Sequence, residues 1–223
     1  MDMDIKVLGI CGSPIKGGNT EVFLQQALGA AGTKGADTEL ISLAKMEIKD
    51  CIHCNWCVRK QEEGKFCNQH DDMELIFPKV IEADAILLAS PVYFTRLSGY
   101  MANMLDRLRC LGHGNHYHRA LKGKVGGGLV VSWFRNTGTE TALLSLLGAF
   151  MASGMTVVSP GLGLGSPLGA IGLSSEGGEG KFDPKERLGV LKDEYGLASA
   201  QQIAREAVDM ARVVKAGQRA LKG

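Results

Sequence analysis

Cys11-Gly-Ser-Pro-Ile-Lys-Gly-Gly-Asn-Thr20 is a loop rich in Gly, Ser and Asn that lies between two apolar segments. Residues 5–10 before it form an apolar run that is typical of a buried strand in a parallel sheet. Residues 21–28 after it have apolar side chains near one face of a helix. A strand, a glycine-containing loop and a helix start leave backbone N–H groups free to bind an anion. The stretch therefore predicts a phosphate-binding loop, with an ordinary loop that caps a helix as the alternative.

Two familiar nucleotide motifs are excluded by the spacing of this loop. A nucleoside-triphosphate loop requires G-x-x-x-x-G-K-[ST], and here Gly18-Asn19 stand where the Lys and the hydroxyl residue belong. The dinucleotide pattern G-x-G-x-x-G is also absent after the strand. The remaining donors, Ser13, Asn19 and Thr20, are neutral. We therefore expect a monophosphate site.

The charge balance of the 223-residue chain argues against nucleic acid as a partner. There are 25 Lys and Arg against 24 Asp and Glu, which gives a net charge of 25 − 24 = +1, and the basic residues form no dense patch in the sequence. The N-terminus has no signal-peptide pattern. The six cysteines then indicate reduced thiols or metal ligands rather than disulfides, and we expect a cytoplasmic protein.

One uncharged stretch, residues 141–175, needs to be tested against a membrane span. Its most apolar part, residues 142–158, is shorter than the roughly 20 residues that a span requires. Gly154 suits the residue that follows a helix. We therefore expect a buried helix followed by a buried strand, and no membrane association.

Strands and helices are predicted to alternate along the chain. The expected strands cover residues 5–10, 38–43, 83–90, 125–132 and 155–158; the expected helices cover residues 21–28, 71–82, 98–110, 137–153 and 198–216. This alternation predicts an α/β fold, a parallel sheet with helices on both faces. Such sheets bind ligands at the carboxyl ends of their strands. The loops 11–20, 91–96 and 132–138 each follow a strand there, so we expect them to form one site.

Several motifs together resemble a known family. They are Gly12-Ser-Pro-x-x-Gly-Gly-Asn-Thr20, a cysteine cluster, Asp71-Asp-Met73, Ser90-Pro-Val-Tyr-Phe94 and Asp106-Arg107. Over roughly the first 150 residues the chain resembles the NADPH-dependent FMN reductase superfamily, and within it the iron–sulfur flavoproteins. The resemblance implies a single flavodoxin-like domain over residues 1–223, doubly wound, with five strands in the order 2-1-3-4-5. It also implies bound FMN and a homodimer or homotetramer. The chain departs from the family at Asn103, where a lysine is usual.

The resemblance assigns the cofactor contacts to three loops. Ser13, Asn19 and Thr20 would hold the FMN phosphate, residues 91–94 would run along the isoalloxazine ring, and residues 133–138 would close its other side. A cation at Arg135 near the N1–O2 edge would stabilise the reduced flavin anion. The aromatic pair 93–94 could instead be core, and residues 136–138 a plain helix cap. The full expected set is Ser13, Lys16, Gly17, Gly18, Asn19, Thr20, Pro91, Val92, Tyr93, Phe94, Trp133, Arg135, Asn136, Thr137 and Gly138.

A cysteine-rich insertion is expected at residues 49–70. Cys51-Ile-His-Cys54-Asn-Trp-Cys57 has the C-x₂-C-x₂-C spacing that can bind one face of a cubane cluster, and Cys67 could complete the set. We expect a [4Fe–4S] cluster on Cys51, Cys54, Cys57 and Cys67. Structural zinc and reduced cysteines without metal remain alternatives. Cys11 and Cys110 are expected to be packing residues.

Two further segments have no assigned role. Residues 159–196 form a glycine-rich insertion, which we expect to be an oligomer arm or an active-site flap. His113, His116 and His118 lie in a Gly-Asn loop, which favours an exposed or interface loop over a metal site and could also place them at the mouth of the substrate site.

The predicted function is that of an FMN-dependent oxidoreductase. Electrons would pass from NAD(P)H or ferredoxin to a small-molecule acceptor such as a quinone, a flavin or a nitro compound. Since the flavin supplies the chemistry, no protein side chain is assigned a catalytic role. A non-catalytic FMN and iron–sulfur electron carrier or redox sensor is the alternative.

Overall fold

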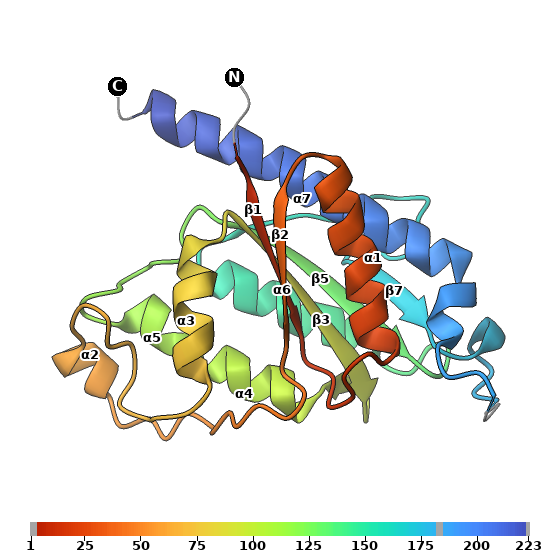
Figure 1. Cartoon of the computed structure of the whole chain (residues 1–223), viewed down its shortest axis with the longest axis horizontal. Coiled ribbons are helices and arrows are strands. Elements are labelled where there is room, and N and C mark those ends of the chain that lie inside the picture. The colour runs from red at the N-terminus through yellow and green to blue at the C-terminus, as the bar shows by residue number, and fades with distance from the viewer. Residues whose placement is uncertain (1–3, 182–184, 222–223) are drawn as a thin grey trace.

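The computed structural model describes residues 4–181 and 185–221, and its centre is a parallel sheet (Figure 1). The main strands are β1 (Lys6–Cys11), β2 (Asp37–Ser42), β3 (Ala85–Tyr93), β5 (Val125–Ser132) and β6 (Thr156–Val157). They pair in the order β2-β1-β3-β5-β6, all parallel, which confirms the predicted order. The order reverses between β1 and β3, so the carboxyl ends of these two strands flank the expected ligand crevice.

Helices cover both faces of the sheet (Figure 1). On one face, α1 (Asn19–Thr33) and α7 (Glu194–Ala220) pack against one another and against residues such as Val7 and Leu87. On the other face, α3 (Met73–Glu82), α4 (Gly99–Arg107) and α6 (Thr139–Ala152) pack on residues such as Leu8 and Ile86. Adjacent residues of one strand thus serve opposite cores, as the pleat requires. The buried parts of β1, β3 and β5 are therefore continuously apolar rather than alternating.

The fifth strand position differs from the prediction. A single strand was expected over residues 155–158, but β6 has two residues and pairs with the start of β5. The end of β5 pairs instead with β7 (Ala170–Leu173), from Leu129↔Ala170 to Ser132↔Leu173. The chain re-enters the sheet at Gly169, where φ is +157° and a Cβ atom would lie 2.5 Å from the carbonyl oxygen of Gly128. Part of the glycine-rich segment 159–196 is therefore sheet, which the sequence analysis did not anticipate.

Several helix boundaries also differ from the prediction. The expected helix 98–110 is divided into α4 and α5 (Arg109–His113). The last helix begins at Glu194, because the Asp193 side chain accepts a hydrogen bond from the Gly196 N–H (2.9 Å) and so caps the helix start. The remaining short elements are α2 (Trp56–Lys60), β4 (Arg96–Leu97) and the 3₁₀ turns η1 (Glu176–Gly178) and η2 (Gly189–Lys192).

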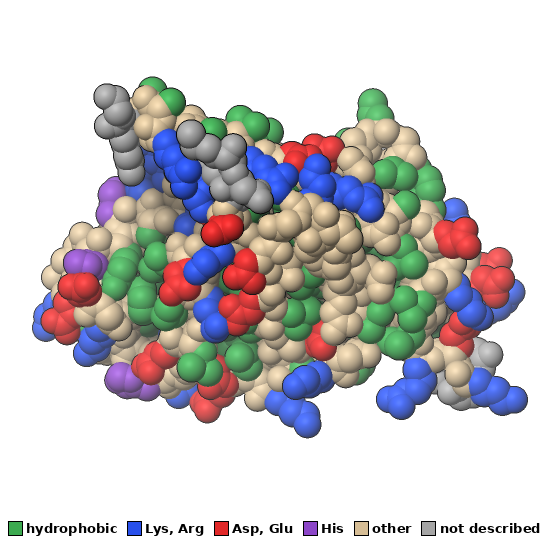
Figure 2. All heavy atoms as spheres, turned by 45° about the horizontal axis from the view of Figure 1, so that its top comes forward, with side chains coloured by type: hydrophobic (Ala, Val, Ile, Leu, Met, Phe, Trp, Pro, Cys, Tyr) green, Lys and Arg blue, Asp and Glu red, His purple; other side chains and the backbone are tan. Residues whose placement is uncertain are grey.

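The surface carries interspersed charges on the face shown in Figure 2, where basic, acidic and apolar side chains alternate. Within residues 4–181 and 185–221, every helix is too short or too polar to cross a membrane.

Candidate functional site

The loop between β1 and α1 is held in place at its start by α4. Ser98 Oγ donates a hydrogen bond to the Gly12 carbonyl oxygen at 2.6 Å. A Cβ atom at Gly12 would lie 2.7 Å from Met101 Cβ, so the approach of the loop to α4 requires glycine. Gly17 has a φ of +67°, which turns the chain toward the helix. Ser13 Oγ accepts a hydrogen bond from the Ile15 N–H at 3.1 Å and so fixes the loop from within.

The start of α1 has the character of an anion site. Its N-cap residue is Gly18, and no described side chain caps the helix. The first N–H groups of the helix therefore remain available to a ligand, at the positive end of the helix dipole. Thr20, which follows in the first turn, is buried.

The hairpin after β3 forms a second side of the site. Tyr93 pairs with Arg96, which leaves Phe94 and Thr95 as a two-residue turn with φ values of +47° and +63°. Such turns normally use Asn-Gly, because both residues have a left-handed conformation. Thr95 is β-branched and Phe94 is 98% exposed, so the turn holds backbone strain and presents an aromatic ring to solvent.

The loop after β5 is joined to the glycine-rich segment by backbone bonds. The Ser174 N–H donates to the Ser132 carbonyl at 2.9 Å, and the Arg135 N–H donates to the Gly178 carbonyl at 2.9 Å. The guanidinium of Arg135 donates to the Gly177 carbonyl through Nε (3.0 Å) and a terminal nitrogen (2.6 Å). Arg135, expected near the flavin edge, thus holds the η1 turn in this structure.

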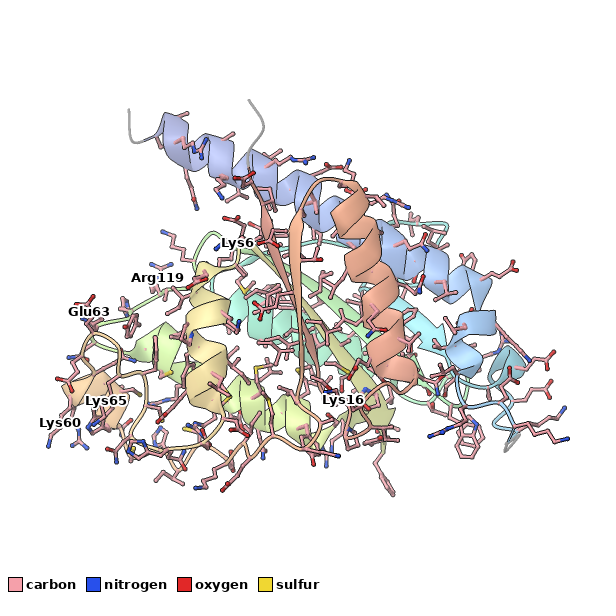
Figure 3. All side chains as sticks on the ribbon, in the orientation of Figure 1. Lys6, Lys16, Lys60, Glu63, Lys65 and Arg119 are labelled. Carbon is pink, nitrogen blue, oxygen red and sulfur yellow. The ribbon has the colours of Figure 1, made fainter. Side chains whose placement is uncertain are left out.

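These loops enclose one pocket of about 1600 Å³ at the carboxyl ends of β1, β3 and β5. The side chain of Lys16 lies in this region, beside the start of α1 (Figure 3). Of the residues predicted from the sequence, the pocket lining includes Ser13, Lys16, Gly17, Gly18, Asn19, Thr20, Pro91, Val92, Tyr93, Phe94, Trp133 and Thr137. It does not include Arg135, Asn136 or Gly138. Gly138 acts on the hairpin instead: its φ is +94°, and a Cβ there would lie 2.4 Å from Thr95 Cα.

The sequence analysis missed the wall supplied by the glycine-rich segment. Its lining residues are Ser174, Ser175, Glu176, Gly177, Glu179, Lys181, Glu186, Arg187 and Leu188. The abundance of glycine between the last strand and the last helix was a signal for a flap, but it gave no indication of which residues would face the pocket.

Charges around the pocket are partly paired within the glycine-rich segment. Lys181 contacts Glu179 at 2.5 Å, and Lys192 contacts Glu186. Burial raises the pKa of Tyr93, so its hydroxyl remains protonated at neutral pH. Burial also raises the pKa of Cys11 to about 12, which agrees with its expected role as a packing residue.

The cysteine segment lies on another side of the molecule, where Lys60, Glu63 and Lys65 are labelled in Figure 3. A buried ion pair, formed by Arg107 and Asp71, holds the two ends of this segment together. Arg107 binds Asp71 through two nitrogens, one of them at 3.1 Å, and donates to the Lys49 carbonyl at 2.9 Å. Burial alone would raise the pKa of Asp71, but the hydrogen bonds from Arg107 and from the Lys49 N–H outweigh it and hold the pKa below its usual value.

A buried amide joins the middle of the cysteine segment to α5. Gln61 Nε2 donates to the carbonyls of Phe66 (2.8 Å) and Cys110 (3.0 Å). Its Oε1 accepts from the N–H groups of His116 (3.2 Å) and Tyr117 (3.0 Å). All four hydrogen-bonding positions of the amide are therefore used. The rings of Phe66 and Tyr117 stack beside it with centroids 4.5 Å apart.

The four expected cluster ligands differ in exposure. Cys57 is buried, Cys51 and Cys67 are half-buried, and Cys54 is exposed. Arg109 approaches Cys57 Sγ at 3.7 Å. Burial raises the pKa of Cys57, and Arg109 partly offsets this effect. Across the described residues, no group of three or more His, Cys, Asp or Glu side chains is arranged to hold a metal ion, so the arrangement seen here does not show the cluster site.

The three histidines are not part of the pocket lining. His113, His116 and His118 are exposed, and their loop packs on the cysteine segment through Gln61. The suggestion that they line the substrate mouth is not supported by this placement.

The order of the sheet and the position of the pocket define a flavodoxin-like α/β protein. Solved structures with this fold include RosB with bound 8-demethyl-8-formylriboflavin-5'-phosphate, which has a TM-score of 0.72 and 16% identity and covers 95% of this chain and 80% of that one. A WrbA-like flavodoxin from Agrobacterium tumefaciens has a TM-score of 0.57 and 16% identity, covering 95% and 99%.

Sequence comparison gives the family. Residues 5–166 match the model of the NADPH-dependent FMN reductase family, and the chain belongs to this family of FMN-dependent oxidoreductases. An iron–sulfur flavoprotein of Methanocaldococcus jannaschii is 36% identical over 214 residues, which are 95% of this chain and 100% of the relative. An NAD(P)H dehydrogenase (quinone) of Bradyrhizobium sp. is 31% identical over 119 residues, 48% of this chain and 57% of the relative.

Proposed function

We propose that the pocket binds FMN and that the protein transfers electrons from NAD(P)H to a small acceptor such as a quinone. The observation that carries the proposal is a pocket that combines an uncapped helix start with aromatic walls. A flavin mononucleotide needs both, one for its phosphate and one for its ring. Family membership and the names of the relatives support the same cofactor.

Different residues of the pocket would bind the phosphate and the ring of the cofactor. Backbone N–H groups at the start of α1 would bind the phosphate, together with the loop hydroxyls. The stiff segment that begins at Pro91 and the ring of Trp133 would flank the isoalloxazine and exclude water from it. The bound flavin itself supplies the redox chemistry, because it accepts either a hydride or single electrons.

The test is an absorption spectrum of the purified protein followed by steady-state turnover. We expect flavin absorbance that remains with the protein on gel filtration, and oxidation of NADH or NADPH in the presence of a quinone, free flavin or nitro compound. A protein that binds no flavin would contradict the proposal. Bound flavin with no turnover on any acceptor, together with rapid exchange with reduced ferredoxin, would favour an electron carrier instead.

We further propose that Cys51, Cys54, Cys57 and Cys67 bind a [4Fe–4S] cluster. The proposal is supported by the C-x₂-C-x₂-C spacing, by four cysteines in one segment that form no disulfide, and by relatives named as iron–sulfur flavoproteins. Iron and acid-labile sulfide should both be present after anaerobic purification. Cys57→Ser should remove them, whereas Cys110→Ala, which changes a buried thiol outside the set, should not. Zinc without sulfide would contradict the cluster.

A further inference from the structure

The side chain of Asn19, which the sequence analysis assigned to the flavin phosphate, bonds instead to the glycine-rich segment. Its Nδ2 donates a hydrogen bond to the Arg187 carbonyl at 3.2 Å, and its Oδ1 accepts one from the Val190 N–H at 3.0 Å. Both polar atoms of the side chain are therefore committed to the glycine-rich segment, 168 and 171 residues away in the sequence. An amide used in this way at both ends is a clamp between two loops.

The clamp brings one cation into the pocket. Arg187, whose carbonyl Asn19 holds, contributes to the same pocket lining as the phosphate loop. Its neighbour Glu186 is paired with Lys192, and Lys181 is paired with Glu179. Within residues 4–181 and 185–221 the Arg187 guanidinium has no carboxylate partner, and the residue is exposed. An unpaired guanidinium that shares a pocket with a phosphate loop is suited to a phosphate dianion.

We propose that Arg187 is the charged ligand of the flavin phosphate and that Asn19 is a positioning residue, which holds segment 187–190 against the phosphate loop. This inference rests on the proposed binding of FMN and deepens it. It assigns Asn19 to the wall of the pocket instead of to the phosphate. It also adds a second positive charge to a loop whose side-chain donors, apart from Lys16, are neutral, and a doubly charged phosphate favours this.

The two roles differ in how they depend on the phosphate. Riboflavin has the ring and ribityl chain of FMN but lacks the phosphate. A residue that binds the phosphate should affect FMN alone. A residue that holds the pocket wall should affect both flavins, because the wall also encloses the ring and the chain.

The experiment measures the dissociation constants of FMN and riboflavin for the full-length protein freed of flavin, by quenching of flavin fluorescence. For Arg187→Gln we expect FMN binding to weaken by about 10- to 100-fold, since a charge-assisted contact is lost, and riboflavin binding to change less than about twofold. Arg219→Gln, on the exposed end of α7, is the matched control and should change neither.

Asn19→Ala should weaken the binding of both flavins, and amide hydrogen exchange in residues 185–191 should become faster. If Asn19→Ala weakens FMN alone and leaves both riboflavin binding and exchange unchanged, Asn19 is a phosphate ligand and the clamp is wrong. Equal losses for the two flavins in Arg187→Gln would overturn the role of Arg187. Failure of the wild-type protein to bind either flavin would instead overturn the FMN proposal, and this inference with it.

Discussion

The cysteine segment and the glycine-rich segment lie on different sides of the molecule, and each is attached to the rest of the fold in a different way (Figure 1). The cysteine segment is fastened by buried side chains, chiefly the Arg107–Asp71 pair and Gln61. The glycine-rich segment is fastened by backbone hydrogen bonds along β5 and by the Asn19 clamp. One attachment depends on a few buried polar groups, and the other is spread over many weak contacts.

This difference teaches where each segment is vulnerable. A buried charge or amide that loses its partner cannot form replacement hydrogen bonds with water. Single substitutions of these buried groups should therefore lower the free energy of unfolding strongly. Backbone hydrogen bonds survive most side-chain changes. Substitutions in the pocket wall should therefore alter ligand binding more than the free energy of unfolding.

Arg107→Met should have the largest effect on stability. It leaves the Asp71 carboxylate buried without its partner, which lowers the free energy of unfolding by about 3–5 kcal/mol. Urea unfolding at pH 7 measures this. Arg109→Met is the control, because Arg109 is half-buried and carries no such ion pair in the described structure; its effect should be well under half as large. Equal effects for the two variants would show that the ion pair does not fasten the segment.

Low pH should also weaken the Arg107–Asp71 attachment, but by less than Arg107→Met does. The pKa of Asp71 is lower in the folded than in the unfolded protein, so its contribution to stability is complete above the unfolded pKa of about 4 and disappears as the pH falls through the folded pKa. A protonated Asp71 still accepts a hydrogen bond, so the loss is smaller than in Arg107→Met. The measurement is urea unfolding of the wild type and Asp71→Asn between pH 7 and pH 3. Their stability difference should shrink below about pH 4; a constant difference would contradict the assignment.

Gln61→Leu should be the next most damaging change. Leucine cannot hydrogen-bond to the two carbonyls and two N–H groups that the amide now satisfies. We therefore expect the free energy of unfolding to fall by about 2–3 kcal/mol. Gln69→Leu is the control, since Gln69 makes one exposed hydrogen bond, to the Asp50 carbonyl. A loss below about 0.5 kcal/mol for Gln61→Leu would show that the amide is dispensable.

The sequence predicts those parts of this comparison that depend on local patterns. The apolar runs of β1, β3 and β5 are continuous because both faces of the sheet are covered, so their position and order could be anticipated. The loop before Thr20 was identified from its glycines and its place between a strand and a helix. These signals lie within one or two elements of the chain.

Attachments between distant segments could not be predicted. β7 has four residues, and its pairing with β5 brings Gly169 close to the Gly128 carbonyl, an approach that no local pattern indicates. Nothing near Asn19 indicates that its partners are at residues 187 and 190. Arg135 was expected to face the flavin edge, but its guanidinium contacts Gly177, and this contact depends on a turn that forms elsewhere in the chain.

Replacing Phe94-Thr95 by Asn-Gly should have the smallest effect on stability and the opposite sign. Both residues have positive φ values in a two-residue turn, and Asn-Gly adopts that conformation with less strain, so we expect the free energy of unfolding to rise by about 1 kcal/mol. Thermal or urea unfolding of Phe94→Asn, Thr95→Gly and the double variant measures it. Most of the gain should come from Thr95→Gly, since a β-branched residue is the less suited of the two to this turn.

Phe94 and Thr95 also line the pocket, so FMN affinity should be measured on the same variants. A more stable double variant with weaker FMN binding would show that the strained turn serves the ligand, whereas a less stable one would show that Phe94 and Thr95 make contacts that outweigh their strain.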